Sequence, residues 1–137
     1  MDMEVFFPGN KKVHVRYKDF VIETDQPVKA GGDGSAPTPF DLFLASLAAC
    51  AGIYVLSFLQ QRDLPTDGAG LVLRQERDPE TKMVRKISLE IKLPADFPEK
   101  YREAVIRAAD QCAVKRHIDN PPVFETYVTI GQEGNES

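Results

Sequence analysis

The feature that most constrains this chain is an uninterrupted apolar run, residues 42–59, which contains no charged side chain. Cys50, one of only two cysteines in the chain, lies at the centre of this run. Such a segment fits a membrane-spanning helix, a buried core helix with an inert sulfur, or an apolar wall around a reactive thiol. The rest of the sequence decides between these three interpretations.

The start of this segment carries the signals of a helix N-terminus. Thr38 is a suitable N-cap, Pro39 suits the first helical position, and Asp41 follows Thr38 by three residues as a capping-box variant. These signals predict a helix that begins at Pro39 and ends near Gln61, before Leu64 and Pro65.

A membrane-spanning role does not fit this helix. Its charge-free run is near the lower limit for crossing a bilayer and is rich in Ala, Ser and Gly, and Asp41 and Arg62 flank it without a cationic bias. A helix that is apolar on nearly all sides must instead be buried on all sides. Because a two-layer domain of 137 residues can hardly bury it alone, we expect a dimer in which two sheets enclose two such helices.

The remaining segments predict an α+β fold with a mostly antiparallel sheet. A second helix is expected from Asp96, with an apolar stripe formed by Tyr101, Val105, Ala108 or Ala109, and Cys112. Residues 29–39 are expected to form a loop. The expected strands are residues 11–17, 20–24, 71–77, 83–93 and 123–130, of which the first four form two hairpins.

Composition and charge narrow the class of protein. The length predicts one domain over residues 1–137, with a frayed polar tail at residues 131–137. A net charge of −4 and scattered basic residues argue against nucleic-acid binding, and GGDG at residues 31–34 is interpreted as a turn. The N-terminus has no signal-peptide pattern, which predicts a cytoplasmic location. His14 and His117 lack zinc-ligand spacing relative to the cysteines, so no metal or cofactor is expected.

The two cysteines are the candidate reactive groups. Each lies on an expected apolar helical face, where a thiol is often only a small buried hydrophobe. If the two faces meet, however, the sulfurs can form a reversible disulfide. Lys115 and Arg116 follow Cys112 closely and would favour a thiolate, although cations near a helix end also stabilise the helix dipole.

Asp41 and Arg16 are weaker candidates for the same site. Asp41 lies nine residues before Cys50 and either only caps its helix or also holds an arginine near the thiolate. Arg16, in the first hairpin, is a candidate for that arginine; otherwise it is an exposed charge on an edge strand.

PTPFDLFLASLAAC at residues 37–50 and DQCAVKRHI at residues 110–118 together resemble the OsmC/Ohr family of osmotically inducible and organic-hydroperoxide-resistance proteins. The two cysteines are 62 residues apart, as in the family pattern of two cysteine motifs some sixty residues apart. Asp41 stands one residue later than the acidic residue of the Ohr branch, and Ala113 and Val114 replace the usual Pro-Val. The match is therefore better to the broader OsmC-like branch.

This resemblance implies an intertwined homodimer with active sites at the subunit interface. It implies a thiol-dependent peroxidase that reduces organic hydroperoxides, alkyl or lipid, with Cys50 as the peroxidatic cysteine and Cys112 as the resolving one. A dithiol of lipoyl or similar type would then reduce the disulfide, and Asp41 and Arg16 would assist Cys50. The alternatives are a non-catalytic member that binds a small ligand, and a redox sensor that docks a partner after oxidation.

Overall fold

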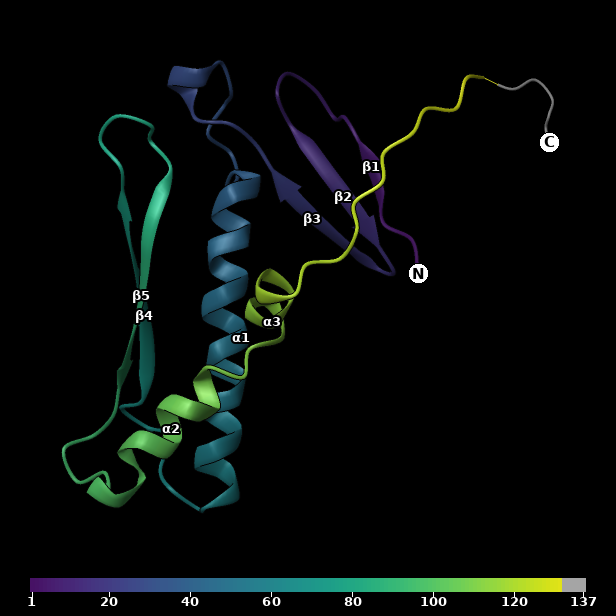
Figure 1. The fold of residues 1–137 in the computed structure, drawn as a ribbon. Coiled ribbons are helices and arrows are strands. Elements are labelled where there is room, and N and C mark those ends of the chain that lie inside the picture. The colour runs from purple at the N-terminus through teal and green to yellow at the C-terminus, as the bar shows by residue number, and fades with distance from the viewer. Residues whose placement is uncertain (132–137) are drawn as a thin grey trace.

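The computed structural model describes residues 1–131 and has an α+β architecture (Figure 1). One long helix, α1 (Pro39–Gln61), runs beside a two-stranded antiparallel sheet, and two short helices pack across it. A three-stranded antiparallel sheet stands near the N-terminal end of α1 (Figure 1). The predicted antiparallel pairing is confirmed, but within the chain it is divided between two separate sheets.

The predicted boundaries of α1 are confirmed, and the N-terminal cap has the expected geometry. The Thr38 hydroxyl accepts a hydrogen bond from the Asp41 backbone N–H at 3.2 Å, and the Asp41 carboxylate accepts one from the Thr38 backbone N–H at 3.1 Å. This reciprocal pair satisfies two backbone donors that the first helical turn leaves without partners.

The N-terminal sheet contains the predicted first hairpin and one additional strand. Strands β2 (Val13–Tyr17) and β3 (Phe20–Thr24) pair through a tight turn in which Lys18 has a φ of 54°. Strand β1 (Glu4–Phe6) pairs with the other edge of β2. The sequence analysis did not predict β1, which has only three residues and ends two residues before Pro8.

The loop between β3 and α1 is organised by Asp25, a buried carboxylate. Asp25 accepts hydrogen bonds from the backbone N–H of Gln26 at 2.7 Å and from the backbone N–H and hydroxyl of Ser35 at 3.0 and 2.6 Å. These donors hold the pKa of Asp25 far below its usual value. Gly32 lies so close to the Gln26 carbonyl that a side chain would clash with it. The glycine-rich segment is therefore a fixed turn, which includes a short 3₁₀ helix, η1 (Val28–Ala30).

The second hairpin also agrees with its predicted position. Strands β4 (Gly70–Arg77) and β5 (Val84–Lys92) pair in antiparallel register, with Leu73 opposite Leu89, and the ladder is irregular at Glu76 and Arg77. The hairpin runs alongside α1 (Figure 1), and β4 contacts that helix.

The predicted second helix starts later than expected. Asp96 does not cap it; the segment begins with a 3₁₀ turn, η2 (Glu99–Tyr101), and continues as α2 (Arg102–Ala109). Pro98 explains the difference, because the residue before a proline is disfavoured in the helical conformation. Cys112 lies beyond α2 and caps a further helix, α3 (Ala113–Asp119), which the sequence analysis did not predict.

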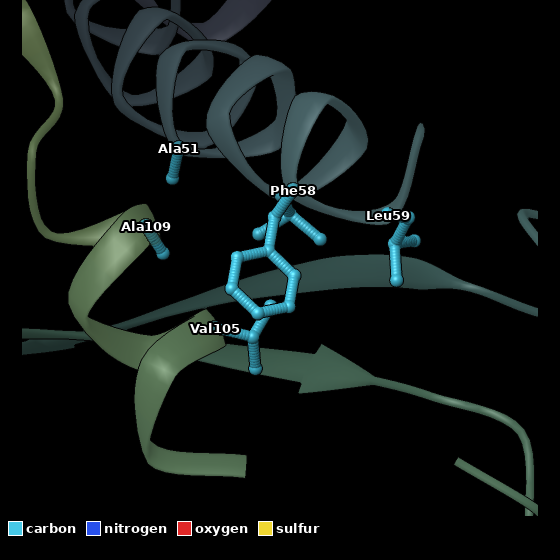
Figure 2. Packing of buried hydrophobic residues seen from close by; sticks show 6 residues of the cluster. Ala51, Phe58, Leu59, Val105 and Ala109 are labelled. Atoms are coloured by element: carbon cyan, nitrogen blue, oxygen red, sulfur yellow. The ribbon is translucent and has the colours of Figure 1, made fainter. Parts of the chain in front are cut away.

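The core forms where α1 and α2 cross above the β4–β5 hairpin. Figure 2 shows the side chain of Phe58 pointing towards Val105, and Ala51 facing Ala109. The two helices therefore run in opposite directions, with the end of α2 close to the middle of α1. The buried residues of this core are Ala51, Val55, Phe58, Leu59, Val105 and Ala109.

The expectation that a single chain cannot bury α1 on all sides is confirmed. The helix is not buried on all sides, because Ala45, Ala49, Ile53 and Leu56 form an exposed stripe along it. The stripe lies opposite the core, where no other element of residues 1–131 covers the helix. By length and composition alone α1 could cross a membrane, but the core helix of a soluble protein meets the same criterion.

The prediction of a final strand at residues 123–130 is wrong for the single chain. This segment, here called the C-terminal arm, adopts no strand and leads away from the helices (Figure 1). Its apolar side chains are almost fully exposed, with Val123 96% and Phe124 84% accessible. An alternating apolar pattern forms a strand only where a neighbouring strand pairs with it, and in the described part of the chain residues 123–129 form none. The tail predicted at residues 131–137 lies outside the described residues except for Gly131.

Candidate functional site

The structure brings the two cysteines together. Cys50 lies in the middle of α1, next to the fully buried Ala51, and is partly accessible. Cys112 is 2% exposed and stands at the N-cap of α3, which lies beside α1 and contacts it (Figure 1). Both are free thiols, and each affects the pKa of the other.

The N-terminal end of α3 also acts on Cys50. The backbone N–H of Ala113 donates to the Cys50 sulfur over 3.2 Å. The backbone N–H of Val114 lowers the pKa of Cys50 more than any other group does. Arg116, one turn further along α3, adds a positive charge. Two peptide N–H groups, a thiol and a cation therefore lower the pKa of a single sulfur.

These contacts give the two thiols opposite acidities. The pKa of Cys50 is lowered, chiefly by the Val114 N–H and also by the Cys112 thiol, the Ala113 N–H and the Arg116 charge, against the opposing effect of burial. The pKa of Cys112 is raised, chiefly by burial and also by its interaction with Cys50. The accessible sulfur is thus the more acidic one, and its buried neighbour retains its proton.

The local sequence explains how Cys112 reaches this place. Helix α2 ends in a turn at Asp110 and Gln111, and Cys112 then has the extended backbone (φ −48°, ψ 126°) of an N-cap residue. Its sulfur accepts a hydrogen bond from the backbone N–H of Lys115 at 3.5 Å. The Cys112 sulfur therefore caps the N-terminus of α3. The first residue of that helix, Ala113, then has its backbone N–H directed at Cys50.

The other two predicted site residues lie elsewhere in the chain. Asp41 is engaged in the helix cap with Thr38, more than two turns of α1 from Cys50. The Arg16 guanidinium lies over the Phe6 ring, 4.4 Å from its centroid, on the N-terminal sheet. Among residues 1–131 no ion pair joins Arg16 to Asp41.

The sequence analysis missed the main groups that act on Cys50. Backbone N–H groups occur at every residue except proline, so no residue type marks Ala113 and Val114 as donors. Arg116 was the one residue in the sequence whose type could have indicated a lowered Cys50 pKa, but the sequence analysis noted it only as a neighbour of Cys112. Among residues 1–131 no cluster of three or more His, Cys, Asp or Glu side chains could hold a metal ion.

Two cavities flank α2. One, of about 550 Å³, lies between α2 and β5 and has largely apolar walls. The other, of about 510 Å³, lies between α1 and α2. Its lining includes Tyr54, one turn after Cys50, and Gln111, next to Cys112, but neither cysteine itself.

The family model described as OsmC-like protein matches residues 32–127, a range that includes both cysteines. The chain belongs to the OsmC-like family. A comparison with curated proteins gives no match.

Solved structures with the same fold include OsmC and Ohr proteins. A putative osmotic stress induced and detoxification response protein from Psychrobacter arcticus is 20% identical, with a TM-score of 0.70 over 83% of this chain and 85% of that one. The organic hydroperoxide resistance protein OhrB of Bacillus subtilis is 20% identical, with a TM-score of 0.53 over 88% and 93%. A putative organic hydroperoxide resistance protein from Vibrio cholerae, with captopril in one active site, is 18% identical, with a TM-score of 0.57 over 88% and 86%.

Proposed function

We propose that this OsmC-like protein is a thiol peroxidase that reduces organic hydroperoxides through Cys50 and Cys112. The observation that carries the proposal is the convergence of the Ala113 and Val114 N–H groups and the Cys112 thiol on the Cys50 sulfur. A thiolate is the nucleophile in peroxide reduction, and donors of this kind favour it. The occurrence of organic hydroperoxide resistance proteins among the structural neighbours supports the same reaction class.

The geometry suggests a role for each sulfur. The Cys50 thiolate attacks the terminal oxygen of the hydroperoxide, the O–O bond breaks, and the departing alkoxide takes up a proton to become an alcohol. Cys50 is left as a sulfenic acid, which the adjacent Cys112 thiol converts to a disulfide with release of water. An external dithiol, lipoyl or similar, then reduces the disulfide by exchange and leaves as its own cyclic disulfide.

The surroundings of Cys50 favour hydroperoxides with apolar chains over hydrogen peroxide. The aromatic rings of Tyr54 and Phe58 follow Cys50 along α1 and line the α1–α2 cavity. Each methylene group that such a surface removes from water contributes about 0.8 kcal/mol to binding. An alkyl or lipid hydroperoxide gains this free energy and hydrogen peroxide does not.

We propose that the working unit is a homodimer. The exposed stripe on α1 (Ala45, Ala49, Ile53 and Leu56) and the apolar C-terminal arm are surfaces that a soluble monomer would not leave in water. A second copy offers a matching stripe and strands with which the arm can pair. The proposed role of Arg16, to stabilise the Cys50 thiolate, also depends on the dimer. In this arrangement the N-terminal sheet of one subunit carries Arg16 to Cys50 of the other subunit, and Asp41 orients the Arg16 guanidinium there.

The test of the proposed reaction is to follow loss of cumene hydroperoxide in the presence of the purified protein and a dithiol. We expect consumption by the wild type and none by Cys50→Ser, while Cys112→Ser turns over poorly but still reacts once. Equal consumption by wild type and Cys50→Ser would end the proposal. A disulfide that forms without turnover would favour the redox sensor, and thiols that resist both oxidation and iodoacetamide would favour the ligand-binding alternative.

A further inference from the structure

The cavity between α1 and α2 has an unusual charge distribution for an acidic protein. Two arginines line it, Arg62 from the end of α1 and Arg107 from α2, together with uncharged polar groups and apolar walls. No aspartate or glutamate is among its lining residues. Within residues 1–131 neither arginine makes an ion pair. This open cavity is therefore bordered by two exposed guanidinium groups that make no ion pair within the described chain.

Arg62 is held in place in this cavity. Its guanidinium carbon lies 3.7 Å from the centroid of the Phe58 ring and 5.5 Å from that of Tyr101. One of its terminal nitrogens donates to the Phe58 carbonyl at 3.3 Å. A guanidinium has five N–H groups, so most of its donors are available to a ligand. Arg107 approaches the same cavity from the opposite wall.

The cavity lies along the face of α1 that carries Cys50, although Cys50 is not among its lining residues. Tyr54 and Ser57 line it and follow Cys50 by four and seven residues, a spacing that places all three on one face of α1. Phe58, over which the Arg62 guanidinium lies, is eight residues from Cys50, or about 12 Å along the helix axis. An extended chain could thus react at Cys50 while its other end lies between the two arginines.

We propose that Arg62 and Arg107 form a subsite for the carboxylate of a linear hydroperoxide, so that the preferred substrates are acids with an apolar chain. This inference rests on the proposed function. A planar carboxylate accepts paired hydrogen bonds from guanidinium groups, which suits it to two arginines in one cavity. The apolar walls formed by Tyr54, Ala104 and Ala108 contact the chain between the two ends.

Direct binding tests the subsite without requiring any chemistry. In a Cys50→Ser background, calorimetry with decanoate and with 1-decanol should show that the acid binds about tenfold or more tightly, as expected for charge-assisted hydrogen bonds. In Arg107→Gln, and separately in Arg62→Gln, this acid-to-alcohol preference should fall to near one. Arg85→Gln, which alters an exposed arginine of the β4–β5 hairpin, is the matched control and should retain the preference.

Equal binding of decanoate and 1-decanol by the Cys50→Ser protein, or an unchanged preference in Arg107→Gln, would overturn the subsite whether or not peroxides are reduced. Arg107→Gln is the decisive variant because Arg62 also stacks on core rings. Binding of decanoate by a protein that reduces no hydroperoxide would instead overturn the proposed function and retain the carboxylate site.

A kinetic experiment tests whether the carboxylate that binds the two arginines belongs to the substrate or to the reductant. With uncharged dithiothreitol as reductant, Arg107→Gln should raise the ratio of KM for a fatty-acid hydroperoxide to KM for cumene hydroperoxide by about tenfold. Arg85→Gln should leave that ratio unchanged. An effect that is present only when dihydrolipoate replaces dithiothreitol would assign the carboxylate to the reductant and overturn the inference.

Discussion

Replacement of Ala113 by proline would remove one hydrogen-bond donor from Cys50 while preserving the helix that positions it. Ala113 is the first residue of α3, where proline is well tolerated because its missing N–H has no helical partner. The preceding residue, Cys112, already has the extended conformation that a following proline requires. The 3.2 Å contact from the Ala113 N–H to the Cys50 sulfur would be lost.

The size of the effect follows from this single contact. A hydrogen bond to a charged group contributes about 1.5–3 kcal/mol, and the lower value is appropriate because the stronger Val114 donor remains. About 1.4 kcal/mol corresponds to a tenfold change in an equilibrium, so the thiolate fraction at a pH below the pKa should fall about tenfold. A more basic thiolate is intrinsically more reactive, with a Brønsted slope of about 0.4–0.5, which offsets about threefold of this loss.

The assay is the pH dependence of Cys50 alkylation by iodoacetamide, read at the Cys50 peptide by mass spectrometry. Because the Cys50 pKa is lowered in the native protein, the thiolate persists to lower pH and alkylation rises as the pH passes through that pKa. In Ala113→Pro the rise should move to higher pH, with a rate near neutrality about threefold lower. Ala113→Gly keeps the N–H and is the control. A midpoint that is the same in all three proteins would refute the role of this donor.

Three other predictions concern the cap, the core and the second sulfur. Cys112→Ser should allow over-oxidation of Cys50 by excess peroxide, seen by mass spectrometry as two or three added oxygens; clean single oxidation would contradict the resolving role. Asp41→Asn should cost about 0.3–1 kcal/mol of stability, measured by thermal unfolding, because the variant loses a negative charge near the start of α1 but keeps a hydrogen-bond acceptor. A large loss of peroxidase rate at an unchanged melting temperature would show that Asp41 does more than cap the helix. Leu59→Ala should cost about 2–5 kcal/mol and lower the urea midpoint, and a negligible change would mean that the core in Figure 2 does not dominate stability.

The elements that could be predicted from sequence are those whose signals are local. The limits of α1 follow from Thr38, Pro39 and Asp41, three neighbouring residues whose effects act within one turn. The β2–β3 and β4–β5 hairpins likewise combine β-prone runs with short turns. Helix α3 was missed because a cysteine sulfur caps it, and cysteine is not among the residues preferred at that position.

The parts that could not be predicted depend on distant partners. The C-terminal arm has the alternating pattern of a strand, but a strand exists only where another strand pairs with it, and no pattern within the arm identifies that strand. The proximity of Cys50 and Cys112 depends on how α2 crosses α1, which the spacing of 62 residues does not specify. The two arginines of the α1–α2 cavity were unremarkable in sequence for the same reason.

The position of the C-terminal arm has a consequence for how the protein is made. Its eight residues are synthesised after every helix that forms the core, and at about 5–20 residues per second their synthesis takes on the order of one second. The arm is therefore the last of the described segments to become available for pairing, after every helix of the core has been synthesised. Pairing of the arm with a second copy, as proposed above, is accordingly a late step in assembly and follows synthesis of all the elements that hold Cys50 and Cys112.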